Sequence, residues 1–344
     1  MAPTLVAFVL VAAACGSGGS KNNSSGGSGS SANPPSSVAS GSTPTSSTPS
    51  GGSGAWSAPT SIDPGNLLQS VSCAATTFCV AVDGLSGTGT VAGNALTYNG
   101  TTWSKPVAVG SPASLYSVSC PTTTFCASVD NSGNAFTLNG TSWTAAKNAD
   151  ANPFQAVSCA SQSFCVAVDN SGSALTWDGS KWSAPKAFAG DQALDAVACP
   201  TATFCMAVDG TGVYSFDGTT WSPAKTLGSG SSGPAAISCP TATFCVAVGM
   251  DGSTYNFNGS SWSTQSKLDV VNGVALGLDG VTCQSPSFCM AYSGENNRWM
   301  TYNGSVWSAP AMVGNGQGPK SVSCPTANLC VAVDGHDSTL TWHS

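Results

Sequence analysis

Charged side chains are scarce in this sequence. They make up 7% of its 344 residues, whereas roughly 25% is usual in soluble proteins. The chain has a single arginine, Arg298, a single glutamate, Glu295, and a net charge of −7. A protein that binds nucleic acid needs many lysines or arginines to displace the counterions of the phosphates. The composition therefore argues against a nucleic-acid partner.

Residues that could serve as catalysts are equally few. The only histidines, His336 and His343, lie at the C-terminal end, which disfavours a Ser-His-Asp hydrolase. A glycosidase needs two carboxylates around the scissile bond, but most aspartates recur at equivalent positions of a sequence repeat, where an Asx-type turn is expected. These are Asp83, Asp130, Asp169, Asp209 and Asp334. We predict no catalytic residue, no metal site and no cofactor, and a protein that is not an enzyme.

The sequence has no long hydrophobic run. Its longest, Leu5 to Ala14, has ten apolar residues, whereas a membrane-spanning helix needs about 20. This run suits the hydrophobic region of a signal peptide over residues 1–14. Small residues then lead to Cys15, which resembles the lipid-modified cysteine of bacterial lipoproteins. Two departures from that pattern are the absence of Lys or Arg before the run and Ala12 in a position where Leu is usual.

Three interpretations of this N-terminus remain open: a lipoprotein anchored at Cys15, a simply secreted protein, or an uncleaved cytosolic one. The lipoprotein is the favoured prediction, with the membrane reached only through the lipid. Residues 15–54 are almost entirely Gly, Ser, Thr, Pro and Asn. Such a segment buries too little apolar surface to offset the entropy of ordering, so we predict a disordered tether.

What the chain does have is a repeat, best seen in AISCPTATFCVAV at 236–248. Its first cysteines lie about 40 residues apart, which is typical of the four-stranded blades of β-propellers. The seven cysteine pairs are Cys73 and Cys79, Cys120 and Cys126, Cys159 and Cys165, Cys199 and Cys205, Cys239 and Cys245, Cys283 and Cys289, and Cys324 and Cys330. We therefore predict an all-β fold, a seven-bladed β-propeller over residues 55–344.

Each repeat divides into four expected strands, here called A to D. In the first repeat, strand A is LQSVSC at 68–73, strand B is FCVAVD at 78–83 and strand C is ALTY at 95–98. An Asn-Gly or Asp-Gly pair follows, which favours a two-residue type I′ hairpin turn. A tryptophan three residues after the glycine, such as Trp103, marks strand D. We expect all the tryptophans to pack within and between blades.

The last repeat ends within the chain's final residues and lacks strand D. Its strand C is STLTW at 338–342, and a spare strand D, AWSAP, occurs at 55–59. We predict that this N-terminal strand completes the last blade and closes the ring. Closure removes an exposed sheet edge that would otherwise favour aggregation.

The paired cysteines have two possible roles. Metal binding favours Cys-x-x-Cys spacing or histidine partners, whereas here five residues separate the members of each pair. Disulfides suit an exported chain, and the simplest connectivity is one local bridge across each A–B hairpin. Each bridge should contribute about 2 kcal/mol. We favour seven disulfides.

The repeat resembles the Cys-rich propeller repeats of exported actinobacterial proteins, which read roughly SCPTxxFCxAV…G…W. The resemblance covers residues 55–344 and implies export and a seven-bladed architecture like that of sialidase-like and WD-repeat propellers. It implies no activity. Sialidases also carry an arginine cluster and Asp-box motifs, and SGSALTWDG at 171–179 only approximates such a motif.

Two functions remain in competition. The favoured one is a non-catalytic binding or scaffolding module, monomeric, exported and at the cell surface, for a protein or glycan partner. The alternative is a carbohydrate-active, glycosidase- or sialidase-like enzyme. Loops between strands B and C vary in length, and variable loops on a constant scaffold often bind ligands. The unusual B–C loops of blades 6, 7 and 1 predict a ligand site at Glu295, Asn296, Asn297, Arg298, His336 and Asp337.

Overall fold

The structure is a computed structural model that describes residues 54–84, 93–111, 113–144, 147–227, 233–264, 267–271, 273–314 and 317–344. The predicted signal peptide, Cys15 and the tether up to residue 53 lie outside the described residues, and so does most of the blade 1 B–C loop, at 85–92. Among the described residues every regular element is a strand. No helix there could cross a bilayer.

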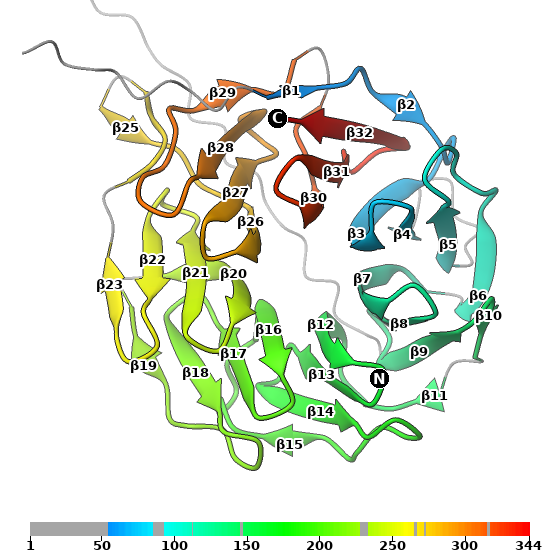
Figure 1. Cartoon of the computed structure of the whole chain (residues 1–344). Coiled ribbons are helices and arrows are strands. Elements are labelled where there is room, and N and C mark those ends of the chain that lie inside the picture. Colours follow the sequence, from blue (N-terminus) through cyan, green and yellow to red (C-terminus); the bar gives the residue numbers. More distant parts are fainter. Residues whose placement is uncertain are drawn as a thin grey trace, which may run out of the picture. The chain divides into compact units, whose positions relative to one another are not determined.

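The described strands form a ring of seven antiparallel sheets around a central opening (Figure 1). This confirms the predicted seven-bladed β-propeller. Neighbouring innermost strands contact each other all the way around, including those of the last and first blades. We number the blades in the order of their cysteine pairs.

Each blade runs from strand A at the central opening to strand D at the rim. The A strands are β3 (Leu67–Ala75), β7 (Leu115–Thr122), β12 (Phe154–Ser161), β16 (Ala196–Thr201), β20 (Pro234–Thr241), β26 (Gly280–Ser285) and β30 (Ser321–Thr326). The B strands are β4 (Phe78–Gly84), β8 (Phe125–Asp130), β13 (Phe164–Asp169), β17 (Phe204–Val208), β21 (Phe244–Gly249), β27 (Phe288–Ser293) and β31 (Leu329–Val333).

The outer half of each blade is shorter. The C strands are β5 (Gly93–Tyr98), β9 (Asn134–Asn139), β14 (Ser173–Trp177), β18 (Gly212–Phe216), β22 (Thr254–Phe257), β28 (Arg298–Tyr302) and β32 (Ser338–His343). The D strands are β6 (Val107–Ser111), β10 (Ser142–Trp143) with β11 (Lys147–Asn148), β15 (Lys186–Ala187), β19 (Lys225–Thr226), β23 (Trp262–Thr264), β29 (Ala311–Met312), and β1 (Ala55–Trp56) with β2 (Thr60–Ser61).

The ring closes as predicted. Strand β1 pairs with β32 through Trp56 and Trp342, and β2 pairs with the other end of β32 through Thr60 and Thr339. The backbone N–H of Ser57 also donates to the carbonyl of Thr341 at 2.7 Å. The first strands of the propeller therefore form the outer part of its last blade.

The core lies between the blades. In strand β4, Val80 and Val82 pack against blade 2, whereas Cys79 and Ala81 on the opposite face pack against blade 7. All four side chains are fully buried. Both faces of each B strand are therefore apolar because each strand is covered by a neighbouring blade on either side.

All seven predicted disulfides are present, one across the A–B hairpin of each blade, and each joins cysteines six positions apart. In blade 1 the two cysteines stand directly opposite each other on strands A and B. Such cross-strand neighbours are close enough to be bridged without moving the backbone. The bridges join Cys73 to Cys79, Cys120 to Cys126, Cys159 to Cys165, Cys199 to Cys205, Cys239 to Cys245, Cys283 to Cys289, and Cys324 to Cys330.

The second cysteine of each pair is the more deeply buried of the two. It lies in the buried run of strand B and is fully enclosed in every blade. The first cysteine, on strand A, keeps part of its surface accessible in several blades. Each bridge therefore ties the inner strand to the packed interior of its blade. The fully buried members are Cys79, Cys126, Cys165, Cys205, Cys245, Cys289 and Cys330.

A second repeating bond joins the blades. The hydroxyl of Ser72 accepts a hydrogen bond from the backbone N–H of Cys120 in the next blade, at 2.9 Å. Ser323 of blade 7 makes the same contact with Cys73 of blade 1, again at 2.9 Å. The serine of the repeated Ser-Cys pair thus ties adjacent A strands together, a role that the sequence pattern did not reveal.

The C–D turns correct one prediction. A type I′ turn needs positive φ at both central residues, but Gly100 has φ of 95° while Asn99 is not among the residues with positive φ. Asn99 instead opens a four-residue turn, and its side-chain oxygen accepts the N–H groups of Thr101 and Thr102. Asp178, Asp217, Asn258 and Asn303 do the same.

The tryptophans pack as expected in the outer half of the blades. Trp103, which precedes strand D of blade 1 and forms an isolated bridge with Tyr98, lies against the ring of Tyr98 in strand C, with ring centroids 5.3 Å apart. Phe125 of blade 2 stacks on Trp177 of blade 3 at 6.3 Å. Aromatic contacts within and between blades therefore continue the core out to the rim.

Candidate binding surface

The ring has two unlike faces. One carries the A–B hairpins and C–D turns, and we call it the hairpin face. The other carries the B–C loops and the D–A connections between blades, and we call it the loop face. The loop face also bears an extra hairpin, β24 (Val270–Val271) with β25 (Val274–Ala275), within the long connection from blade 5 to blade 6.

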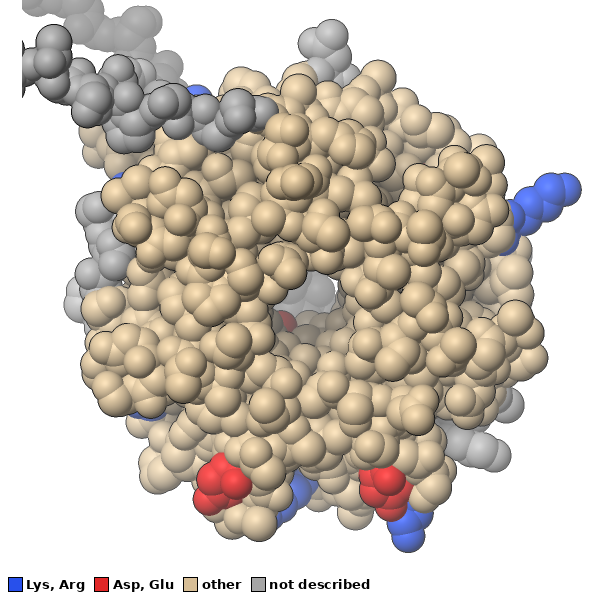
Figure 2. Space-filling model, viewed as in Figure 1, with Lys and Arg blue, Asp and Glu red and all other residues tan. Residues whose placement is uncertain are grey.

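Acidic residues are concentrated on the loop face. Of the 16 acidic residues, all but Asp178 and Asp217 lie at the ends of B strands, in B–C loops or in D–A connections. Figure 2 shows a face with few charged side chains: acidic side chains lie at two places near its edge, another is visible deep in the central opening, and basic side chains extend from the rim. This matches the hairpin face. The loop face therefore carries most of the negative charge.

Several of these carboxylates have the structural role that the repeat predicted. Asp130 accepts the N–H groups of Ser132 and Asn134 at 2.9 and 2.8 Å. Asp169 accepts those of Ser171 and Ser173 at 2.9 and 2.7 Å. Both aspartates are fully buried, so each holds a B–C loop against the end of its strand.

Some carboxyl groups on the loop face also raise the pKa of a neighbouring carboxyl group. Burial, reinforced by the neighbouring carboxyl of Asp63, raises the pKa of Asp83 to about 7. Asp195 lies just before strand β16. Its side chain is exposed to water, but nearby protein atoms still desolvate its carboxyl group. Desolvation and the nearby charge of Asp209 raise its pKa to about 6. On the hairpin face the pKa of Asp178 is instead lowered to about 2 by hydrogen bonds from Ser180 and Lys181.

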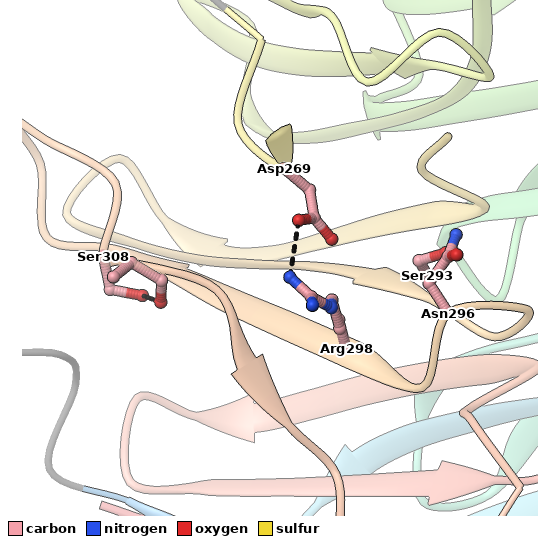
Figure 3. Close-up of polar contacts among 6 residues, drawn as sticks. Asp269, Ser293, Asn296, Arg298 and Ser308 are labelled. Carbon is pink, nitrogen blue, oxygen red and sulfur yellow. Dashed lines mark hydrogen bonds and ion pairs between the residues drawn. The ribbon is translucent and has the colours of Figure 1, made fainter. Parts of the chain in front are cut away.

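The only arginine has a partner within the chain. Arg298 Nη1 lies 2.8 Å from Oδ1 of Asp269 (Figure 3). Asp269 is completely buried and precedes β24, and its carbonyl accepts the N–H of Leu276 beyond β25. Arg298 thus fastens the base of the extra hairpin to blade 6. Its predicted ligand role stays a prediction.

The neighbouring asparagines shape the blade 6 loop. Asn296 donates from Nδ2 to the hydroxyl of Ser293 at 2.9 Å (Figure 3). Asn297 has a φ of 52°, and its Nδ2 donates to the carbonyl of Gly314 at 3.1 Å. Asparagine tolerates this left-handed conformation better than most residues, which accounts for its place in the turn.

His336 and Asp337 support the ring closure. The carbonyl of His336 accepts the N–H of Leu68 at 2.7 Å. Oδ2 of Asp337 accepts the hydroxyl of Ser61 at 2.9 Å. Hydrogen bonds from Ser338 and Ser61 lower the pKa of Asp337. The structure therefore places these two residues against the β2–β3 connection rather than beside Arg298.

Glu295 alone of the predicted residues lines a cavity. This hollow of about 380 Å³ lies between blades 5, 6 and 7 on the loop face. Glu295 and Lys320 are exposed, while Asp279 accepts the N–H of Gly294 at 2.6 Å. The main side chains around it are Met250, Asp279, Glu295, Gln317, Lys320 and Asp334. Sequence reasoning did not anticipate Met250, Asp279 and Lys320, although the long connection 263–280 was a visible signal.

Further hollows occur at the rim between the outer strands of neighbouring blades. One of about 480 Å³ lies between blades 2 and 3, and others lie between blades 3 and 4 and between blades 4 and 5. Their walls are equivalent residues of the repeat, among them Trp182, Trp221 and Trp262. They follow from the shape of the blades, whereas the loop-face cavity is formed where the repeat is irregular.

Among the residues that the structure describes, no cluster of three or more His, Cys, Asp or Glu side chains could hold a metal ion. No family model matches the chain, and no curated protein matches it either.

Many solved structures resemble this chain. The WD40 repeats of RRP9 align with a TM-score of 0.66 and 9% identity, over 83% of this chain and 99% of theirs. YCF48 bound to D1 peptide aligns with a TM-score of 0.64 and 12% identity, over 84% of this chain and 97% of that one. YCF48 from Cyanidioschyzon merolae gives 0.62 and 14%, over 84% and 99%. These likenesses establish the β-propeller class.

Proposed function

We propose that this protein is a non-catalytic module that binds a partner protein through its loop face. The observation that carries the proposal is the contrast between the faces. The hairpin face carries seven equivalent A–B hairpins and six C–D turns with little charge, whereas the loop face combines unequal loops, an extra hairpin, a cavity and most of the acidic residues. A solved propeller of the same architecture, YCF48, binds a peptide.

The hydrogen bonds made by the carboxylates around the cavity favour a binding role over glycoside hydrolysis. Asp334 accepts the N–H groups of His336 and Ser338, and Asp279 accepts that of Gly294. Both carboxylates beside Glu295 therefore hold backbone N–H groups of their own loops, which supports a structural role for them, whereas a glycosidase needs two carboxylates placed around the sugar. Aryl glycosides should not be hydrolysed by the full chain. Turnover that disappears in Glu295→Gln would contradict the non-catalytic assignment.

We further propose that the protein is exported and anchored by lipid at Cys15. Seven disulfides in one chain support an oxidising compartment. Cells of the source organism fed an alkyne-labelled fatty acid should label the wild-type protein but not Cys15→Ser. Equal labelling of the two would contradict the anchor.

The binding role is tested by capturing envelope proteins of the source organism on the full chain. Two variants separate the faces: Asp191→Lys with Glu295→Lys on the loop face, and Lys181→Glu with Val306→Asp on the hairpin face. Quantitative mass spectrometry should find a protein retained by the wild type and the hairpin-face variant but lost from the loop-face variant. Capture of nothing, or loss only from the hairpin-face variant, would overturn the proposal.

A further inference from the structure

Exposed apolar side chains gather where blades 5 and 6 meet. Few large hydrophobic residues in the described chain are exposed, and four of them belong to this junction: Met250, Val270, Val274 and Met312, at 62%, 50%, 63% and 59%. Met250 lies in the blade 5 B–C loop, and the two valines lie on the extra hairpin. Exposed apolar groups that cluster in this way mark interaction sites more often than scattered ones do.

The face of the extra hairpin that carries Val270 is turned toward the loop that holds Met250. Val270 pairs with Ala275 across the hairpin, so their side chains share one face. The methyl group of Ala275 approaches Gly252, in the loop that holds Met250, and Gly277 lies against the backbone of Met250. Val274 pairs with Val271 instead, and its side chain therefore projects from the opposite face of the hairpin.

Met250 lines the acidic cavity and also belongs to the exposed apolar pair with Val270. The cavity therefore adjoins that pair. Around the cavity, the carboxylates of Asp279, Glu295 and Asp334 outnumber the single ammonium group of Lys320. Its volume of about 380 Å³ is at the lower end of the range for ligand pockets, which suits one long side chain. A cation held there would be attracted by the carboxylates of the surrounding face.

The ion pair of the buried Asp269 with the partly exposed Arg298 gives this junction a fixed geometry. It fastens the hairpin to blade 6 from one side. On the other side, Leu268 N–H donates to the carbonyl of Gly252 at 3.1 Å, and Lys267 pairs with Asp251 at 3.0 Å. The hairpin is therefore held at its base by both neighbouring blades, with its apolar side chains still exposed.

We propose that an extended segment of the partner protein binds across this junction, with an apolar side chain against Val270 and Met250 and a nearby lysine or arginine in the cavity beside Glu295. The two anchors of the segment are close in its sequence because Met250 borders both contacts. This inference rests on the proposed binding function and specifies which sector of the loop face is used and what chemistry it recognises.

The test selects random 12-residue peptides displayed on phage against the full chain. We expect enriched sequences to place Leu, Ile, Val or Phe within three residues of Lys or Arg. Binding of a selected peptide should weaken at least tenfold in Val270→Ser with Met250→Ser, and at least tenfold in Glu295→Lys. It should also weaken as salt is raised from 50 to 500 mM, because the attraction is screened.

Matched control variants show which part of the loop face binds the selected peptide. Val274→Ser with Met312→Ser removes equally exposed apolar groups outside the proposed contact, and Asp191→Lys makes the same charge change elsewhere on the loop face. Both controls should bind within twofold of the wild type. If Asp191→Lys abolishes binding and Glu295→Lys does not, the inference fails while the binding role of the loop face stands. If no peptide is enriched, or if only hairpin-face changes reduce binding, the inference and the proposed function fail together.

Discussion

The hairpin face and the loop face belong to the same ring but are stabilised differently. The A–B hairpins that border the hairpin face carry the same disulfide in every blade, and serine hydroxyls join most A strands to their neighbours. On the loop face the aspartates at the ends of B strands also repeat, but the two ion pairs among the described residues, Arg298 with Asp269 and Lys267 with Asp251, have no counterpart in other blades. Repeated bonds maintain the scaffold, and single bonds position features that one blade alone possesses.

The largest expected effect comes from opening the ring. Deleting residues 55–61 removes β1 and β2 and exposes the edge of β32 and the side chain of Trp342, which is now 2% exposed. Loss of a buried tryptophan contact alone costs about 3–5 kcal/mol, and the free edge favours aggregation. Urea unfolding and light scattering measure both. Deleting residues 21–50 is the control and should change neither, and equal behaviour of the two deletions would contradict closure by the N-terminal strand.

The second effect concerns the bond that holds the extra hairpin. Arg298→Gln leaves the buried carboxylate of Asp269 without its partner. Because the Arg298 side chain is partly exposed, the cost should lie below the ~3–5 kcal/mol of a fully buried ion pair. Hydrogen exchange should accelerate in residues 267–279 and remain unchanged in blades 2 and 3. Unchanged exchange at 267–279 would show that Arg298 does not position the hairpin and would return it to the role of a free ligand-binding residue.

A single disulfide should matter less. Replacing Cys239 and Cys245 by alanine opens a loop of about seven residues and should cost about 2 kcal/mol, read from the urea midpoint. The same change at Cys120 and Cys126 should cost about as much because the hairpins are equivalent. Losses of unfolding free energy that differ widely between blades would contradict the interpretation of the hairpin face as a regular scaffold.

One carboxyl group on each face, Asp83 on the loop face and Asp178 on the hairpin face, should also respond to pH with opposite signs. The folded pKa of Asp83, about 7, lies above its ordinary value of about 4. Its contribution to stability is therefore fully present below pH 4 and is lost as pH rises through 7. The pKa of Asp178 is lowered to about 2, so its contribution is present above pH 4 and is lost as pH falls through 2.

Thermal unfolding of two variants separates these contributions. Asp83→Asn should flatten the decline of stability between pH 4 and 7, whereas Asp178→Asn should leave that window unchanged and alter the response below pH 4. An unchanged slope in Asp83→Asn would show that the carboxyl pair with Asp63 does not titrate as described.

The smallest effect concerns the serine contacts between blades. Ser72→Ala removes the acceptor of the Cys120 N–H and should cost about 1 kcal/mol. Blade 4 naturally has Ala198 at the equivalent position, so Ala198→Ser offers the reverse change and should stabilise the protein by up to about 1 kcal/mol. If both substitutions lower stability, the hydroxyl is not the reason for the repeated serine.

The repeating part of the molecule was largely predictable from sequence. Evenly spaced cysteine pairs implied seven blades and their disulfides, and the spare AWSAP strand at 55–59 implied how the ring closes. The C–D turn was predicted wrongly because the side chain of Asn99 accepts two backbone N–H groups and holds the residue in an ordinary conformation, so that only Gly100 takes positive φ.

The loop face was harder to predict because its features arise from segments with no counterpart in other blades. The cavity joins Met250, Glu295 and Lys320 from three different connections. The spacing of the repeat contains no information on which of these segments approach one another. The rarity of Arg298 drew attention to it as a ligand-binding residue, which stays a prediction. Its partner Asp269 lies 29 positions earlier in an insertion, where no sequence pattern indicates the contact.

The central claim, that a partner protein binds the loop face, is tested most directly by photo-crosslinking. A photoreactive phenylalanine analogue is placed singly at exposed positions of each face in the full chain, at Gln317 and Asp191 on the loop face and at Thr219 and Ser260 on the hairpin face. Irradiated cells of the source organism should yield a covalent adduct with one protein from Gln317, which lines the loop-face cavity, and none from Thr219 or Ser260. Adducts from the hairpin-face positions alone, or from no position, would contradict the account.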